Sequence, residues 1–224
     1  MWYCVRSARR RRVGGWLAWA GLWFSIVACG GLAAAEDRNI VRVEEDWELV
    51  LKDPDPDLTA PQVTCAISPT GDVDGVHATF ELNHQSYPHF ASGGMRLQMW
   101  TGADNWSSHK TSNDGVMATA GETVRWTQSM RLNSGALTFE IQNGTSSTWG
   151  EFGGEHGLKS TRSTDLPDLN GYDADVSVAN SGTGYASNRV AALTLKRVRI
   201  TFDNGDVVLD ETARVVEQPN DSVE

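Results

Sequence analysis

The chain has 224 residues, of which 40% are hydrophobic and 21% charged, and 29 acidic against 19 basic residues give a net charge of -10. This length suits one well-buried domain plus a targeting segment, and it is too short for two comfortable β-domains. A body this acidic repels nucleic acid and anionic lipid surfaces, so we expect neither as a partner. It favours cations, cationic partners or simple solubility.

The first 35 residues predict an export signal. Four consecutive arginines precede a long uncharged apolar run, and Ala33 and Ala35 before Glu36 fit the small-residue rule for signal-peptide cleavage. We therefore expect residues 1–35 to be removed and the protein to be secreted or held in the cell envelope.

Two alternatives to cleavage remain open. Residues 26–29 resemble a bacterial lipobox, in which Cys29 would carry lipid and become the mature N-terminus. The apolar run is also about long enough to span a bilayer as an uncleaved anchor. In either case the protein would contact the membrane only through its leader or its lipid.

Residues 36–217 form the predicted domain, and the acidic residues 218–224 are expected to fray. Loss of the leader removes five basic residues and no acidic one, which leaves 14 basic and 29 acidic residues and a net charge of -15. If cleavage falls at or beyond Cys29, only Cys65 remains and no disulfide can form within the chain. Stability must then come from a packed core.

Apolar and polar side chains alternate in residues 40–52, the pattern of a strand with one buried face. A proline-rich stretch ends this strand because proline cannot donate to the hydrogen-bond ladder. Residues 62–68 and 76–82 predict two further strands joined by a turn-rich loop. Cys65 shares the apolar face of the first of them, which predicts a buried, unreactive thiol. His77 lies on the polar face of the second and is expected to be solvated.

Residues 95–100 predict a fourth strand. The polar residues 101–115 that follow it predict an exposed loop, and residues 116–120 predict a short strand.

The clearest hairpin comes next. Apolar side chains alternate over residues 122–132 and again from Leu137 onward. The loop 133–135 between them ends with Gly135, which can take the positive φ that a three-residue hairpin loop needs. Trp126 is the predicted core anchor, and such a side chain contributes about 1.5 to 3 kcal/mol when it is buried. Because two strands alone are not stable in water, the rest of the chain must cover their apolar face.

The C-terminal third predicts shorter elements. Residues 144–169 indicate a long surface loop with one short strand, and residues 174–179 another short strand. Residues 189–202 and 206–216 predict a last hairpin, with an Asn-Gly pair in its turn. The apolar phase of its first strand shifts by one residue, which predicts a bulge near residues 196–197.

Together these elements predict an all-β fold, an antiparallel β-sandwich or jelly roll in a single domain. At the level of architecture, the strand order and turn spacing resemble the concanavalin A-like and laminin G-like sandwiches. No motif of either family matches residue by residue, so the resemblance assigns no site.

The familiar catalytic motifs are absent from the sequence: it has no G-x-S-x-G, no H-E-x-x-H, no phosphate loop and no C-x-x-C. We therefore predict no catalytic residue and no enzyme. Glu140, Glu151 and Glu155 are the carboxylates that could serve glycoside hydrolysis, which needs two acids facing one cleft. Their spacing does not reproduce the E-x-D-x-x-E strand pattern of the jelly-roll glucanases.

Oxygen-bearing side chains gather in residues 165–175 and favour calcium over a transition metal. Asp168, Asn170 and Asp173 are the candidate ligands, in a segment that echoes a D-x-N calcium loop. Gly171 stands too early in this segment for the glycine of an EF-hand loop, and no glutamate closes the loop. An acidic turn is the alternative, so the expected cofactor is calcium or none.

Trp106, Trp149 and Tyr172 are the candidate ligand-binding residues, because they lie in or beside predicted loops together with Asn, Asp, Gln and Gly. Flat rings beside such groups suit a sugar, since a ring stacks on the apolar face of a pyranose while polar groups hold its hydroxyls. Alternatively, these rings plug the ends of the sandwich. Trp106 is expected to be the best exposed of them.

These observations favour an exported, non-enzymatic binding or adhesion module, with a glycan as ligand or an envelope protein as partner. One alternative is a structural or assembly protein that binds another protein through an edge strand. A glycan-cleaving enzyme is the third hypothesis. Clustered aromatic rings would favour the first, an exposed apolar edge the second, and two carboxylates across a groove the third.

Overall fold

The structure, a computed structural model, describes residues 38–53, 61–83, 94–112, 121–147, 150–154 and 158–217. For residues 107–112 and Glu217 it describes the backbone only. The leader, the acidic tail, the strand expected at residues 116–120 and Trp149 lie outside the described residues. Within these ranges no helix is long and apolar enough to cross a membrane.

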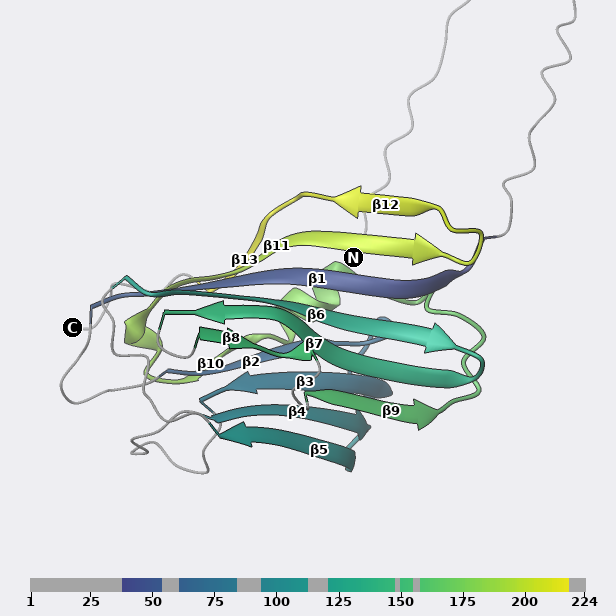
Figure 1. Ribbon diagram of the computed structural model, residues 1–224, viewed down its shortest axis with the longest axis horizontal. Coiled ribbons are helices and arrows are strands. Elements are labelled where there is room, and N and C mark those ends of the chain that lie inside the picture. Colours follow the sequence, from purple (N-terminus) through teal and green to yellow (C-terminus); the bar gives the residue numbers. More distant parts are fainter. Residues whose placement is uncertain are drawn as a thin grey trace, which may run out of the picture. The chain divides into compact units, whose positions relative to one another are not determined.

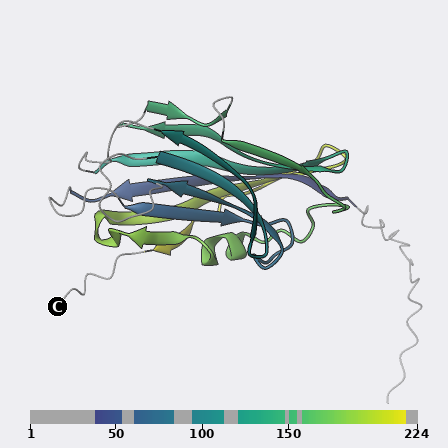
Figure 2. The same ribbon diagram turned by 90° about the horizontal axis from the view of Figure 1, so that it is seen from below.

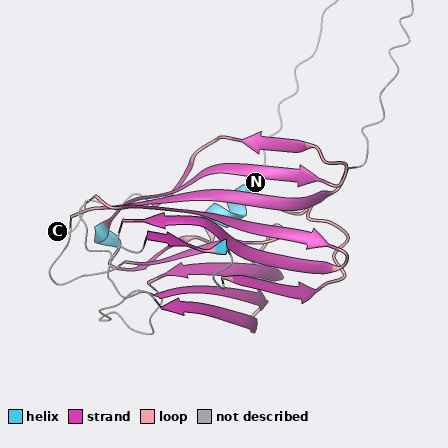
Figure 3. Ribbon diagram, in the orientation of Figure 1, coloured by secondary structure: helices cyan, strands magenta, loops and turns pink. Residues whose placement is uncertain are grey.

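Strands dominate the described chain, and helix occurs only in short pieces (Figure 3). The strands are β1 (Ile40–Leu51), β2 (Gln62–Ile67), β3 (Val76–Leu82), β4 (Gly94–Thr101), β5 (Asp104–Ser112), β6 (Thr123–Asn133), β7 (Ala136–Ser146), β8 (Gly150–Phe152), β9 (Lys159–Ser163), β10 (Gly182–Tyr185), β11 (Val190–Phe202), β12 (Val207–Asp210) and β13 (Arg214–Glu217). The helical pieces include α1 (Ala174–Ala179) and η2 (Ser187–Arg189).

The described strands form two antiparallel sheets that pack together as a β-sandwich (Figure 1). The larger sheet has eight strands in the order β12-β11-β1-β6-β7-β8, with β13 also paired to β11 and β9 also paired to β7. The smaller sheet has five strands in the order β10-β2-β3-β4-β5. The all-β, antiparallel sandwich expected from the sequence is therefore confirmed.

The central hairpin of β6 and β7 is present, but its loop is shorter than expected. Asn133 pairs directly with Ala136, so only two residues connect the strands. Both of them, Ser134 (φ 50°) and Gly135 (φ 73°), have left-handed backbone conformations. Two consecutive left-handed residues give a turn whose twist matches the twist of the strands, which makes a third loop residue unnecessary.

The predicted bulge in β11 is confirmed. Asp46 pairs with Arg197 and Trp47 pairs with Leu195, so Lys196 is one extra residue opposite β1. An extra residue returns the apolar side chains to the core face after the phase shift that the sequence shows.

The prediction of a strand at residues 174–179 is wrong, because this segment is the helix α1. The side chain of Asp173 caps it by accepting a hydrogen bond from the backbone N–H of Asp175. Ala174 and Val178 pack against the core and Ser177 is buried, and this i, i+3, i+4 spacing is that of one helix face. The helix lies against β2, as Figure 2 shows from below.

Two other segments hold more strand than expected, and a third is divided into two shorter strands. The polar residues 104–112 form β5 at the edge of the smaller sheet. Pairing of their backbone with β4 holds this strand in place, so it forms without an apolar face. The presumed loop at residues 144–169 contains two short strands, β8 and β9, and residues 206–216 divide into β12 and β13.

Aromatic side chains join the two sheets at the centre of the core. Trp47 and Trp126 stack with ring centroids 6.3 Å apart, and Phe80 of the smaller sheet meets Trp126 edge-on at 5.7 Å. Cys65 is fully buried and burial raises the pKa of its thiol, as expected for an unreactive core residue. His77, by contrast, is not solvated: its ring is buried and stacks on Trp100.

Candidate functional site

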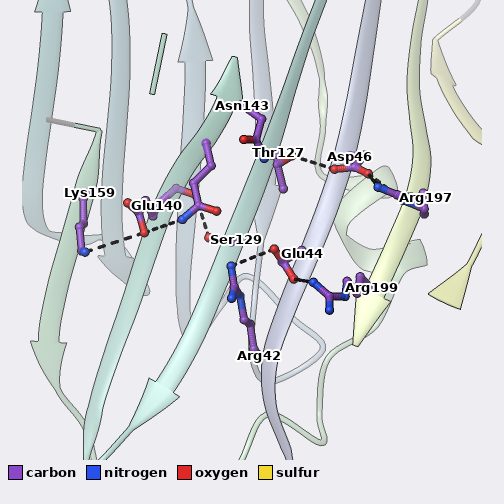
Figure 4. Close-up of polar contacts among 11 residues, drawn as sticks. Arg42, Glu44, Asp46, Thr127, Ser129, Glu140, Asn143, Lys159, Arg197 and Arg199 are labelled. Atoms are coloured by element: carbon purple, nitrogen blue, oxygen red, sulfur yellow. Dashed lines mark hydrogen bonds and ion pairs between the residues drawn. The ribbon is translucent and has the colours of Figure 1, made fainter. Parts of the chain in front are cut away.

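A polar face covers the outer side of the larger sheet (Figure 4). It consists of the side chains of β1, β6, β7 and β11 that alternate with the core residues and therefore point away from the core. The strand register aligns them in rows. One row runs from Arg199 through Glu44, Ser129 and Glu140 to Lys159, across five neighbouring strands.

Most charges on the polar face near β1 are paired. Arg42 Nη2 lies 2.9 Å from Glu44 Oε1, and Arg199 Nη1 lies 3.2 Å from Glu44 Oε2. Arg197 Nε donates to Asp46 Oδ2 at 2.8 Å. Such exposed pairs contribute at most about 1 kcal/mol each, so their main effect is to hold the side chains in place.

A groove of about 730 Å³ opens on this face where β7 meets β8. Its walls are polar and apolar in similar measure and carry two carboxylates. The lining residues are Glu140, Gln142, Asn143, Gly144, Thr145, Glu151, Phe152, Gly153 and Gly154.

A second bulge shapes the groove. Thr127 pairs with Gln142 and Arg125 with Thr145, so two residues of β7, Asn143 and Gly144, stand opposite one residue of β6. Asn143 takes a left-handed backbone (φ 53°), which Asn tolerates better than most residues. The bulge bends β7 at the point where β8 pairs with it.

Glycines allow the backbone of the groove to pack closely. A Cβ at Gly144 would overlap the ring of Phe152. A Cβ at Gly153 (φ 85°) would lie 2.6 Å from the carbonyl oxygen of Ile141. Gly154 (φ 66°) has the same kind of backbone conformation but nothing within 4 Å of a Cβ.

We expect Gly153→Ala to reduce the free energy of unfolding by about 1 to 3 kcal/mol more than Gly154→Ala does. Both substitutions force an L-residue into a left-handed conformation, which costs about 1 to 2 kcal/mol. Only the first adds a clash with β7. Urea unfolding of the two variants checks this, and equal losses would contradict the close packing of β8 on β7.

Hydrogen bonds within the groove orient part of its lining. Gln142 Nε2 donates to Glu140 Oε2 at 2.8 Å, and Lys159 Nζ lies 3.9 Å from the same oxygen. Asn143 Nδ2 donates to Thr127 Oγ1 at 3.3 Å. The exposed carboxylate of Glu151 makes no hydrogen bond with the described residues. The groove thus presents carboxylate and amide groups that can accept or donate hydrogen bonds to a ligand.

The aromatic candidates do not lie in the groove. Trp106 is in β5, half-buried against the core, and the guanidinium of Arg162 stands 3.9 Å above its ring. The expectation that Trp106 lies in an exposed loop is therefore wrong. Tyr172 is also half-buried, and its hydroxyl donates to Glu45 Oε1 at 2.9 Å. No ring contact joins Trp106 to Tyr172 in the described chain, and Trp149 lies outside it.

The oxygens of the calcium candidates are used to shape the chain. Asp168 Oδ1 accepts from the backbone N–H of Asn170, and Asn170 Oδ1 accepts from that of Ile40. Asp173 caps α1. Among the described residues, no three His, Cys, Asp or Glu side chains are grouped to hold a metal ion. Calcium binding by these residues stays a prediction.

Glu45 is an unusual residue that the sequence analysis passed over. It occupies the apolar phase of β1 and is completely buried, where it accepts hydrogen bonds from Trp47 Nε1 (3.0 Å) and the Tyr172 hydroxyl (2.9 Å). Burial raises its pKa to about 7, although these hydrogen bonds and the charge of Arg214 act in the opposite direction. An acid between Val43 and Trp47 in the alternating pattern was the available signal.

No protein-family model matches this chain, and no curated protein is similar to it in sequence. The function must therefore be inferred from the geometry of the groove and of the polar face.

Proposed function

We propose that this protein is an exported, non-enzymatic binding module whose groove between β7 and β8 takes a carbohydrate. The observation that supports it is a groove of about 730 Å³, lined by two carboxylates and two amides, on a sheet face whose other charges are largely paired. Ligand sites of small molecules commonly measure about 300 to 1,000 Å³.

The chemistry of the groove suits sugar hydroxyls. A hydroxyl both donates and accepts, and the carboxylates of Glu140 and Glu151 accept while the amides of Gln142 and Asn143 do both. Glu140 is already held by Gln142, which limits the side-chain entropy lost when a ligand binds. The lining lacks Lys and Arg, so an anionic ligand would be a poor fit.

We extend the proposal to the architecture of the sandwich and to the location of the protein. The sandwich has a concanavalin A-like or laminin G-like, jelly-roll architecture, and residues 1–35 direct it to the exterior or the cell envelope. Lipid attachment at Cys29 would keep it at the membrane surface. A binding module in that location would hold the protein on glycans outside the cell.

Glycan cleavage is the second candidate, because Glu140 and Glu151 line the same groove. Glycosidases use two carboxylates on opposite sides of the bond that breaks. The two functions give different results: an enzyme releases new reducing ends, whereas a binding module leaves the glycan intact.

Calorimetric titration of the purified protein with a panel of soluble polysaccharides tests the proposal. We expect saturable binding, and a loss of about tenfold in affinity for Asn143→Gly, which removes the amide and keeps the left-handed backbone. Arg131→Gln is the matched control, since Arg131 is exposed on the same sheet outside the groove and should change affinity little.

Two results would contradict this proposal. Absence of binding to every polysaccharide would remove the glycan hypothesis. Release of reducing ends, lost in Glu151→Gln while binding persists, would replace the binding module with an enzyme. Repeating the titration after dialysis against a chelator tests whether a calcium ion contributes to binding, and an unchanged affinity would leave residues 168–173 without a part in it.

A further inference from the structure

The strand β12 ends the larger sheet on the side opposite the groove. In the strand order it pairs with β11 alone, whereas β8 lies at the other end (Figure 1). The groove is lined by residues of β7 and β8. Whatever binds at β12 would therefore leave the glycan groove open.

The first three side chains of β12 are apolar and exposed, and they lie on both faces of the sheet. Val207, Val208 and Leu209 keep 43%, 41% and 51% of their surface accessible. Val207 and Leu209 share the face of Thr201 and Arg199, and Val208 shares the face of Ile200. Natural edge strands usually carry Lys, Pro or a bulge that prevents pairing with another strand. β12 has only four residues, and a very short edge is itself less open to pairing, but it contains no Lys, Pro or bulge.

The backbone of β12 also presents free hydrogen-bonding groups. In the turn before it, the N–H of Phe202 donates to the carbonyl of Asp206 and the N–H of Gly205 donates to that of Phe202. Hydrogen-bonded and non-hydrogen-bonded pairs alternate along an antiparallel ladder. Val208 therefore directs its N–H and C=O toward β11, and Val207 and Leu209 direct theirs outward, where the described strands supply no partner.

Acidic residues stand at both ends of this edge. Asp203 and Asp206 precede the strand, and Asp210 and Glu211 end and follow it. Two of these acids have a basic partner, Arg38 beside Asp206 and Arg214 beside Asp210, so the ends keep an excess of negative charge.

This charge pattern disfavours a second copy of the chain as the occupant. Antiparallel pairing of two β12 strands through Val207 and Leu209 would bring the end with Asp203 and Asp206 of one copy beside the end with Asp210 and Glu211 of the other, and each end keeps a negative charge after its one acid–base pair. Like charges directly opposite each other destabilise a strand pair. A strand with basic residues at its ends would instead meet an acid at each end.

We propose that β12 is a docking edge for an extended segment of another protein, with alternating apolar residues between flanking Lys or Arg residues. The segment adds as a strand, its backbone bonded to Val207 and Leu209 and its apolar side chains packed beside those of β12.

The probe is a short peptide of alternating Val and Thr with two Lys at each end, compared with the same peptide flanked by Glu. We expect the Lys-flanked peptide to bind saturably to the purified protein and to shift the backbone amide signals of Val207 and Leu209. The Glu-flanked peptide should bind at least about tenfold more weakly, and added salt should reduce this difference.

Two variants test the location. Leu209→Pro removes one outward N–H without removing a bond to β11, and should weaken peptide binding about tenfold. Leu209→Lys keeps the N–H but replaces an apolar side chain with a positive charge that repels the Lys residues of the peptide, so it should also weaken binding. This variant keeps the test valid if the proline variant does not fold. Asn133→Lys adds the same charge at the β6–β7 turn and should leave binding unchanged.

The proposal is overturned if both peptides bind equally, if neither binds, or if a folded Leu209→Lys variant binds as well as the unaltered protein. Sedimentation analysis provides the remaining check. A dimer that dissociates in Leu209→Lys would make a second copy the occupant and would equally overturn the choice of a basic partner.

Discussion

Trp126→Ala should reduce the free energy of unfolding by about 3 to 5 kcal/mol, the largest single effect that we expect in this protein. The indole is buried, stacks on Trp47 within the larger sheet and meets Phe80 of the smaller sheet edge-on. Its removal would leave a cavity at the contact between the two sheets. Denaturant unfolding, followed by circular dichroism, gives the value.

Phenylalanine variants separate the contribution of ring packing from that of the indole Nε1 hydrogen bond. Trp126 Nε1 has no hydrogen-bond partner among the described residues, so Trp126→Phe removes no bond, and should cost much less than Trp126→Ala. Trp47→Phe loses the hydrogen bond to Glu45 and should cost more than Trp126→Phe, by about 1 to 3 kcal/mol. A loss below about 1 kcal/mol for Trp126→Ala would contradict its place at the centre of the core.

Stability should fall as the pH rises from about 4.5 to about 7, because of Glu45. Its pKa is about 7 in the folded protein, against 4.5 for an unperturbed glutamate. Between these values the folded state holds a proton that the unfolded state has lost, so each rise in pH favours unfolding. The full effect is about 3 kcal/mol, present below the unfolded pKa and lost above the folded one.

Glu45→Gln isolates this contribution from those of the other carboxylates. The amide can still accept a hydrogen bond and carries no charge at any pH, so the variant should be the more stable protein above about pH 7. The stability of the unaltered protein minus that of the variant should decline by about 3 kcal/mol between pH 4.5 and pH 8. A difference that stays constant would show that Glu45 does not take up a proton on folding.

The long strands could be predicted because burial on one face imposes a strict alternation. In β1, β3 and β6 the apolar side chains identify the core face, and the phase change in β11 locates the bulge at Lys196. These features depend on neighbours in the sequence. The packing of Phe80 on Trp126 depends on the pairing of two sheets, which alternation alone does not specify.

The short elements were harder to predict, for physical reasons. Six residues at 174–179 fit either a strand or a helix, and the capping side chain of Asp173 decides for the helix. The polar strand β5 is held by its pairing with β4 and shows no apolar alternation. His77 lies on the polar phase of β3, but the neighbouring Trp100 covers it.

The candidate site was only partly visible in the sequence. Glu140 and Glu151 stood out as carboxylates, but the groove between them arises from a bulge at Asn143 and close packing at Gly153. Neither feature has a periodic signature. The prediction of exposed aromatic rings was wrong for Trp106, because an aromatic residue in a polar segment can pack inward, as Trp106 and Tyr172 do.

Mapping of amide chemical shifts by NMR, with the tightest-binding oligosaccharide from the polysaccharide panel, tests the central claim most directly. The account predicts that the largest shifts fall on residues 140–145 and 150–154, around the groove, and that β12 is unaffected. Shifts concentrated instead around Trp106 on β5, with none at β7 and β8, would contradict the groove as the ligand site.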